Sequence, residues 1–187
     1  FEGDQEEMNA SFADLVRALT LAMLAIYLIL GALFRSVFQP LVVMFAIPMS
    51  GVGVVLGHLL LSRGISLMSL IGVLALAGIV VNDSLILIDF VNVRRRRGRS
   101  MRDALLEACE LRFRPILLTS ITTMLGLLPL TFFVSGQARF LQPMAISIFF
   151  GIALATVLIL VVVPCVYAAL DDLLRLVRRR PDPVSAS

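Results

Sequence analysis

Five long apolar runs restrict what this sequence can fold into more than any other feature. Each has about 20 residues or more, enough for a helix to cross the roughly 30 Å hydrocarbon core of a bilayer. Within hydrocarbon, a single segment satisfies all its backbone hydrogen bonds only as a helix. We therefore expect an all-α membrane protein, a bundle of five transmembrane helices at 15–34, 41–61, 67–93, 115–134 and 141–168.

The composition agrees with a chain embedded in lipid. Of its 187 residues, 59% are apolar and 16% are charged, whereas soluble domains keep about a quarter of their residues charged. The two cysteines, Cys109 and Cys165, are too few for a disulfide framework. Both fall where we expect cytoplasmic ends, so the sequence predicts free thiols.

The arginines predict how the chain is oriented. All 16 basic residues are arginine: eight lie between the third and fourth spans, four follow the fifth span, and Arg35 follows the first. The other side holds only Arg17, Arg63 and Arg139. Because cytoplasmic loops are enriched in basic residues, we expect a periplasmic N-terminus and a cytoplasmic C-terminus.

The segments outside the spans are polar. The chain begins with Phe1 and an acidic stretch, which favours a cut from a longer polypeptide and predicts that residues 1–14 are a periplasmic segment leading from a preceding domain. At the other end, residues 171–187 are predicted to form a basic cytoplasmic tail that is disordered at its end.

The basic run at 94–99 lies between two spans, so it indicates a topology signal and an anchor to anionic lipids rather than a nucleic-acid site. The residues after it, 100–111, begin with Ser100 and Asp103 at the spacing of a capping box. Their apolar positions, Met101, Leu105 and Ala108, share one face. This pattern predicts a short amphipathic helix along the cytoplasmic surface.

Asn82 and Asp83 carry the most specific signal, because both lie near the middle of the third span. An ionised carboxylate at that depth costs at least about 2.5–3.5 kcal/mol. We therefore expect these side chains to face other helices or a water-filled path. Asp89 lies almost two helical turns beyond Asn82, and is assigned first to a contact with the nearby arginines and second to the same polar path.

The fourth span carries a stripe of hydroxyls, since Thr119, Thr122 and Thr123 are spaced at i, i+3 and i+4. Threonines in helices often bond to their own backbone, so the stripe fits either packing or a polar path between helices. His58 is expected at the outer end of the second span as an interfacial histidine. Gly53 and Gly57 have the spacing that allows close helix packing.

Other chemistries lack the residues they need. The sequence contains no phosphate-binding glycine loop, no clustered Cys/His metal set and no Ser–His–Asp arrangement, so we expect no cofactor and no metal. An intramembrane aspartyl protease is disfavoured because Asp83 and Asp89 lie on one helix, whereas facing carboxylates normally come from separate elements.

Two longer motifs resemble a known family. The run GIVVNDSLILIDFVN at 78–92, the run EACELRFRPILLTSITTMLGLLPL at 107–130 and the final helix at 142–167 are similar to resistance-nodulation-division efflux permeases of the AcrB type. The resemblance implies that the five spans are helices eight to twelve of a twelve-helix permease in the bacterial inner membrane. It also implies proton antiport, multidrug resistance, a homotrimer, a periplasmic adaptor protein and an outer-membrane channel.

The resemblance also implies a proton relay. In the family, a lysine on the tenth helix pairs with two aspartates on the fourth helix, and a threonine and an arginine on the eleventh complete the set. The threonine corresponds to Thr119, the arginine to Arg112 and the lysine to Asn82. With Asn82 in place of lysine, either an amide bridges protonated carboxylates, or the coupling ion or stoichiometry differs.

Two alternatives stay open beside this relay. The five spans would instead be a packing and assembly module whose charges all lie in the missing N-terminal half of the permease. The chain would otherwise belong to a relative that exports lipids, because these helices would look alike in both cases.

Overall fold

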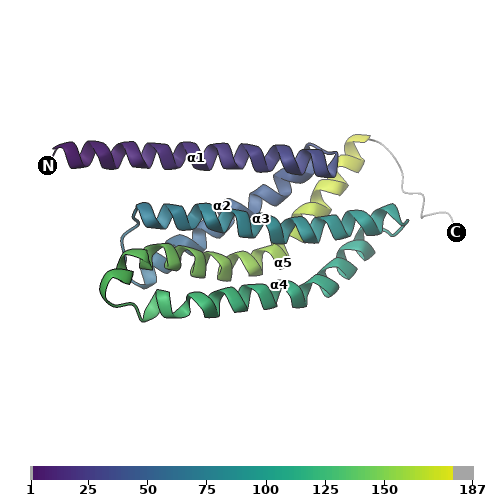
Figure 1. The fold of residues 1–187 in the computed structure, drawn as a ribbon. Helices are drawn as coiled ribbons and strands as arrows, with labels where there is room; N and C mark the ends of the chain where they lie inside the picture. Colours follow the sequence, from purple (N-terminus) through teal and green to yellow (C-terminus); the bar gives the residue numbers. More distant parts are fainter. Residues whose placement is uncertain (1, 179–187) are drawn as a thin grey trace.

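The computed structural model describes residues 2–178, which form five α-helices and one 3-10 helix (Figure 1). The helices are α1 (Glu2–Phe34), α2 (Phe38–Leu60), α3 (Leu67–Arg96), α4 (Met101–Phe132), η1 (Gly136–Leu141) and α5 (Gln142–Arg178). Each α-helix is long and apolar enough to cross a membrane, which confirms the predicted all-α membrane fold.

The surface helix predicted at 100–111 forms, but it is not a separate element. It continues into the fourth span as α4, through Pro115. Its apolar residues Met101, Leu105 and Ala108 are buried in the protein core, so this apolar face packs against the bundle. Burial against the bundle offsets the cost of the backbone hydrogen bond that Pro115 removes. In Figure 1 the first part of α4 runs at an angle to the rest of the helix.

Other boundaries are wider than predicted. The helix α1 begins at Glu2, so the predicted periplasmic segment 1–14 is helical from that residue onward, and α5 continues to Arg178, so the predicted tail begins as helix. The remainder of that tail, 179–187, lies outside the described residues, together with the disorder predicted for it.

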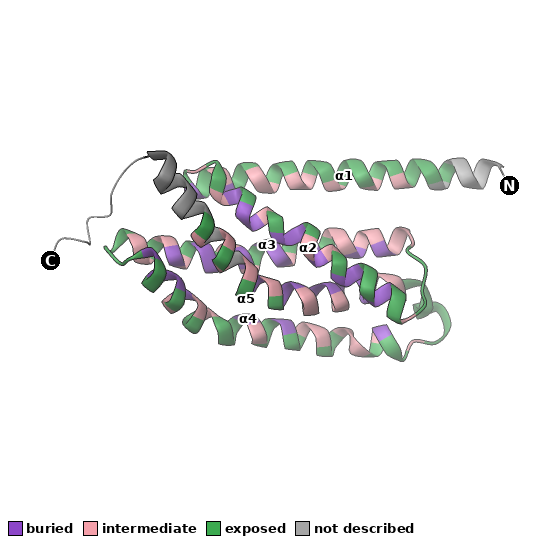
Figure 2. Cartoon of the chain, turned by 180° about the vertical axis from the view of Figure 1, so that it is seen from behind, coloured by how far each residue is buried: buried purple, intermediate pink, exposed green. Residues whose placement is uncertain are grey.

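The helix α5 is the centre of the bundle, since it packs against α2, α3 and α4. At the opposite extreme, α1 makes few contacts. Its buried residues are Leu30 and Phe34 near its C-terminal end, Met23 and Ile26 are partly buried against the core, and just 6% of its most apolar stretch is buried. Figure 2 shows this difference as a mostly green α1 beside the purple stripes of the other helices.

Close packing at α5 depends on small residues. A Cβ atom added to Gly53 would lie 2.5 Å from the backbone oxygen of Phe150, and one added to Gly57 would lie 2.5 Å from the ring of the same residue. Real Cβ atoms do not approach so closely, so only glycine fits at these positions. The prediction that Gly53 and Gly57 serve helix packing is confirmed.

The tight connection between α3 and α4 is specified by local sequence. Gly98 has a positive φ of 84°, and the amides of Gly98 and Arg99 donate to the carbonyls of Arg95 and Arg94, which is a Schellman motif. Ser100 then accepts a hydrogen bond from the amide of Asp103 at 3.2 Å, as the predicted N-cap of α4. This turn places α4 antiparallel to α3 at what we call the arginine-rich end, where α1, α3 and α5 end and α2 and α4 begin.

Candidate functional site

The helix α3 has two unlike sides. One side packs into the bundle through Leu76, Ala77, Val80, Val81, Ser84, Leu87, Ile88 and Val91. The other side, the outer face of α3, is exposed and consists of Ala75, Gly78, Asn82, Ile86 and Asp89. Both sides are rich in apolar residues, so the polar residues on the outer face are its distinguishing feature.

Asn82 lies at the middle of α3 on the outer face, and Asp83 beside it is half-buried. Among the side chains that the structure describes, no hydrogen bond or ion pair joins either Asn82 or Asp83 to another residue. Burial by other helices of this chain therefore does not provide the polar surroundings that the sequence predicts for this pair. Asn82 is left exposed on the outer face, whereas Asp83 is half-buried.

The predicted hydroxyl stripe exists, and its hydrogen bonds stay within α4. Thr119 donates to the carbonyls of Pro115 and Ile116 at 3.1 and 3.0 Å. Thr122 bonds to Leu118 at 2.8 Å, and Thr123 bonds to the carbonyl of Thr119 at 2.7 Å. Thr119 and Thr122 are exposed, and none of the three is hydrogen-bonded to Asn82 or Asp83.

Arg112 is placed at the contact between α3 and α4. Its guanidinium carbon lies 5.2 Å from the centre of the Phe90 ring, and that of Arg94 lies 4.9 Å from the same centre, so two cations contact one aromatic ring. Arg94 also pairs with Glu107 of α4 at 2.9 Å. The Nε atom of Arg112 is buried and has no hydrogen-bond partner among the described residues.

Asp89 is exposed and forms no ion pair with the arginines that follow it, within the described part of the chain. It shares the outer face of α3 with Asn82, as their spacing predicted. The structure thus brings Asn82, Asp83 and Asp89 to one helix, and leaves the threonines on another.

His58 lies in the last turn of α2, at the end of the span as expected, and its side chain is buried in the bundle, with only 3% exposed. Its Nδ1 lies 3.0 Å from the carbonyl oxygen of Val54, an acceptor only, so this nitrogen carries the hydrogen. Its Nε2 lies 2.8 Å from the Oγ of Ser69, which is buried on α3 and accepts from the amide of Ser66. His58 therefore joins α2 to the start of α3.

Two further polar contacts were missed by the sequence reasoning. The hydroxyls of Ser120 and Thr156 lie 2.6 Å apart in the core between α4 and α5. Gln39 and Asn92 exchange hydrogen bonds of 3.2 and 3.0 Å between α2 and α3. The hydroxyl stripe drew attention to the exposed threonines, whereas Ser120, next to Thr119, is the residue that faces α5.

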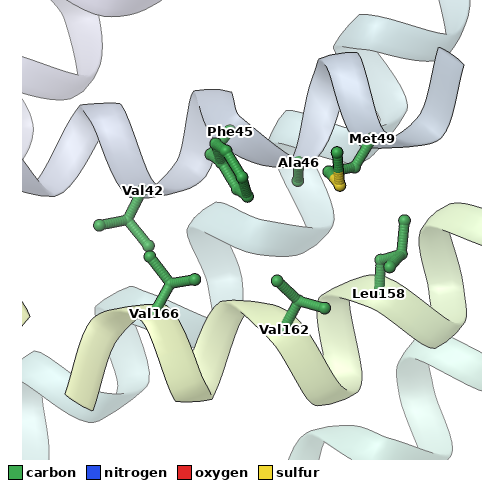
Figure 3. A pocket seen from close by; sticks show the side chains of 7 residues that line it. All are labelled: Val42, Phe45, Ala46, Met49, Leu158, Val162 and Val166. Atoms are coloured by element: carbon green, nitrogen blue, oxygen red, sulfur yellow. The ribbon is translucent and has the colours of Figure 1, made fainter. Parts of the chain in front are cut away.

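The hollow between α2 and α5 has no polar side chain among its described lining residues. Figure 3 shows it lined only by apolar side chains, and it is too narrow to admit water. Its lining residues are Val42, Phe45, Ala46, Met49, Leu158, Val162 and Val166. Within the described residues there is likewise no group of three metal-ligating side chains.

A bundle of five membrane-length helices with a polar outer face at mid-depth defines a polytopic membrane protein. The sequence matches the family model of the AcrB/AcrD/AcrF family over residues 1–171, so this chain belongs to that family. The resemblance noted from the motifs is thereby confirmed.

Individual relatives agree with the family. The chain is 35% identical over 188 residues to the multidrug resistance protein MdtC of Pantoea ananatis (strain AJ13355), and the match covers 100% of this chain and 18% of that protein. It is 33% identical over 183 residues to MdtC of Pectobacterium carotovorum subsp. carotovorum (strain PC1), and that match covers 97% of this chain and 18% of the relative. The chain therefore spans less than a fifth of the length of these relatives.

A solved structure shares the fold. The crystal structure of a heavy metal efflux pump matches with a TM-score of 0.80 at 24% sequence identity, over 89% of this chain and 16% of the pump. At this level of identity the match concerns the arrangement of the helices alone.

Proposed function

We propose that this chain is part of a proton-driven efflux permease of the bacterial inner membrane, and that it contributes one side of an intramembrane proton relay. The family match over residues 1–171 supports the permease assignment, and the names of the MdtC relatives favour drugs as the exported class. Because the chain corresponds to 18% of such a relative, the activity belongs to a larger protein.

The observation that carries the relay proposal is the exposure of Asn82, with half-buried Asp83, at the middle of α3. A carboxylate facing lipid there would cost at least about 2.5–3.5 kcal/mol when ionised. Polar residues inside a membrane are tolerated where other helices or water meet them. We infer that helices outside this chain cover the outer face of α3 and supply the groups that Asn82 and Asp83 contact.

The relay residues have distinct roles in this proposal. Asp83 takes up and releases the proton, Asn82 bridges to carboxyl groups on the covering helices, and Thr119 offers its hydroxyl from α4. Arg112, whose Nε is buried without a hydrogen-bond partner among the described side chains, stabilises the charge that the cluster gains or loses. Asp89, Thr122 and Thr123 extend the path. Movement of one charge through 100 mV supplies about 2.3 kcal/mol, enough to shift helices relative to each other.

The arginine distribution supports an orientation with the arginine-rich end in the cytoplasm and the N-terminus of α1 in the periplasm. Trimer formation, a periplasmic adaptor protein and an outer-membrane channel are proposed from family membership alone. The lipid bilayer is the remaining partner, since all five α-helices have membrane length and hydropathy.

One observation favours a second candidate function, a packing and assembly module. Thr119, Thr122 and Thr123 all bond to their own helix, as threonines without a relay function would. In that case the relay lies wholly on helices outside this chain. Export of lipids instead of drugs stays an alternative for the cargo.

The test uses the full-length protein in proteoliposomes with an imposed pH gradient. Asp83→Asn and Thr119→Val, made separately, are expected to lower drug export and coupled proton flux at least about tenfold, because each removes a group from proton transfer. The midpoint of thermal unfolding is measured on the same samples and is expected to stay unchanged.

Two matched controls separate the relay from packing. Thr20 of α1 is exposed and bonds to the carbonyl of Val16 at 2.8 Å, in the manner of Thr119, so Thr20→Val should export normally. Asp14→Asn removes an exposed carboxylate that pairs only with Arg17 among the described residues, and should also be silent. Full export and proton coupling in both relay variants would support the assembly module instead.

A further inference from the structure

A groove lies between α1 and α2 at the arginine-rich end, where the short turn 35–37 joins the two helices (Figure 1). Its volume is about 570 Å³, within the range of small-molecule sites. We call it the α1–α2 groove, and its described lining residues are Tyr27, Leu28, Gly31, Ala32, Arg35, Ser36, Val37 and Phe38. None of the residues assigned to the relay lines it, so it is a separate feature of the chain.

The groove is elongated along α1. Tyr27 and Arg35 both line it and lie eight residues apart, which corresponds to about 12 Å at the rise of an α-helix. Gly31 lies between them, and a Cβ atom added to it would meet nothing within 4 Å, so the groove is open at that point. The hydroxyl of Tyr27 donates to the carbonyl of Val37 at 3.3 Å and so joins the side of α1 to the turn. The groove therefore extends from the turn along the end of the first span.

The two ends of the groove differ in polarity. At the turn, Arg35 and Ser36 offer a guanidinium group and a hydroxyl, and neither forms a hydrogen bond or ion pair with a side chain that the structure describes. Farther along α1, Leu28, Gly31 and Ala32 have no side-chain group that forms hydrogen bonds. The dipoles at the end of α1 and the start of α2 oppose each other here, so the charge of the described lining comes from Arg35.

The level of the groove in the membrane indicates which ligand it takes. The turn joins the ends of two membrane-length helices and so lies at the level of the lipid headgroups, whereas the apolar part of the lining lies within the first span. A free phosphate would use only the polar end of the groove, but a phospholipid matches both ends. A zwitterionic headgroup would bring a second cation close to Arg35, so a headgroup with a net negative charge is favoured.

We propose that the α1–α2 groove binds an anionic phospholipid. The guanidinium group of Arg35 and the hydroxyl of Ser36 donate to the phosphate, and one acyl chain lies along Leu28 and Ala32.

The test uses the full-length protein in neutral detergent and a phosphatidylglycerol that carries a photoreactive diazirine in one acyl chain. After illumination, mass spectrometry measures the labelling of residues 27–38, with unlabelled phosphatidylglycerol, phosphatidylcholine or inorganic phosphate as competitor. Arg35→Gln is expected to raise the lipid concentration for half-maximal labelling at least about fivefold, the loss expected for one basic residue at a membrane surface. Arg99→Gln is the matched control, because it removes the same charge from an exposed residue at the same end that does not line the groove. It should be labelled like the wild type.

A second pair of variants tests the acyl-chain part of the groove. Gly31→Leu places a side chain in the open space of the groove and is expected to suppress labelling of residues 27–38. Ala25→Leu adds a side chain at an exposed position of α1 outside the groove and should be labelled like the wild type. Unfolding midpoints recorded on the same samples confirm that the variants are folded.

Several results would overturn the proposal. Equal weakening by Arg35→Gln and Arg99→Gln would indicate a general effect of surface charge. Phosphatidylcholine that competes as well as phosphatidylglycerol would mean that the headgroup charge is not recognised, and inorganic phosphate that competes as well would mean that the site serves a free anion. A wild type without labelling at 27–38, or labelling that Gly31→Leu leaves unchanged, would mean that no acyl chain lies in the groove, as expected if helices outside this chain fill it.

Discussion

The outer face of α3 and the interface around α5 both contain glycines and polar residues. They differ in what these residues contact. Around α5, glycines allow backbones to approach, and the polar groups Ser120 and Thr156 meet each other. On the outer face, a Cβ atom added to Gly78 would meet nothing within 4 Å, and Asn82 forms no hydrogen bond with any side chain that the structure describes. The difference is that glycines and polar residues pack against a neighbouring helix around α5, whereas on the outer face of α3 they remain exposed.

The largest expected effect tests the α5 interface. Gly53→Leu forces side-chain atoms against the backbone of Phe150, so we expect the free energy of unfolding to fall by about 3 kcal/mol. Gly51→Leu is the control, because Gly51 lies on the same helix with open space around its Cβ position. This variant should leave the free energy of unfolding nearly unchanged. Thermal unfolding of the full-length protein measures both, and equal destabilisation would show that packing at Gly53 is not special.

The next effect concerns the buried polar link between α2 and α3. Ser69→Ala removes the partner of His58 Nε2 and leaves that nitrogen buried without a hydrogen bond, at a cost of about 2 kcal/mol. Ser62→Ala, in the exposed connection between the same helices, provides the comparison. Chemical unfolding reports the difference, and a silent Ser69→Ala would mean that His58 does not depend on this contact.

A third prediction concerns whether a substitution of Asn82, on the outer face of α3, lowers or raises stability. If other helices cover this face, Asn82→Leu loses an interhelical hydrogen bond and lowers stability by about 1 kcal/mol. If the face meets lipid, leucine favours the hydrocarbon by about 0.3–0.6 kcal/mol and stability rises. We expect the loss, and a gain measured by thermal unfolding of the full-length protein would break the comparison drawn above.

The smallest effect is the coupling between Ser120 and Thr156. A double-mutant cycle of Ser120→Ala and Thr156→Val should give a coupling energy of about 0.6 kcal/mol, the average for such bonds within membranes. A second cycle with Thr119→Val in place of Ser120→Ala should give none, because Thr119 is exposed and bonds to its own helix. Coupling at Thr119 as large as at Ser120 would contradict the separation of the two regions.

Much of the fold could be predicted from sequence, because helix length and hydropathy are local properties. The five spans, the cap at Ser100 and the close packing at Gly53 and Gly57 were all correctly predicted. The separation of 100–111 from the fourth span was not, since a proline permits either a break or a bend, and packing of Met101 and Leu105 favours the bend.

The candidate site was less accessible to sequence reasoning. Asn82 and Asp83 stand out because polar residues in a span are few. Their presence in the span does not show which side of the helix will be buried. The burial of His58 likewise depends on Ser69, a residue eleven positions away on the next helix, and no periodicity connects the two. The pairing of Gln39 with Asn92 spans 53 positions and has no local signal.

The sequence by itself determined that this chain forms membrane-length helices, which ends carry the arginines, and which few polar residues lie at depth. Only the tertiary structure decided which side of each helix is buried. The physical reason is that an apolar side chain is as well placed against lipid as against protein, so hydrophobicity alone cannot separate the two sides of α3. Which side is buried depends instead on shape and hydrogen bonding: glycines allow a neighbouring helix to approach closely, and hydroxyl groups form hydrogen bonds with that helix.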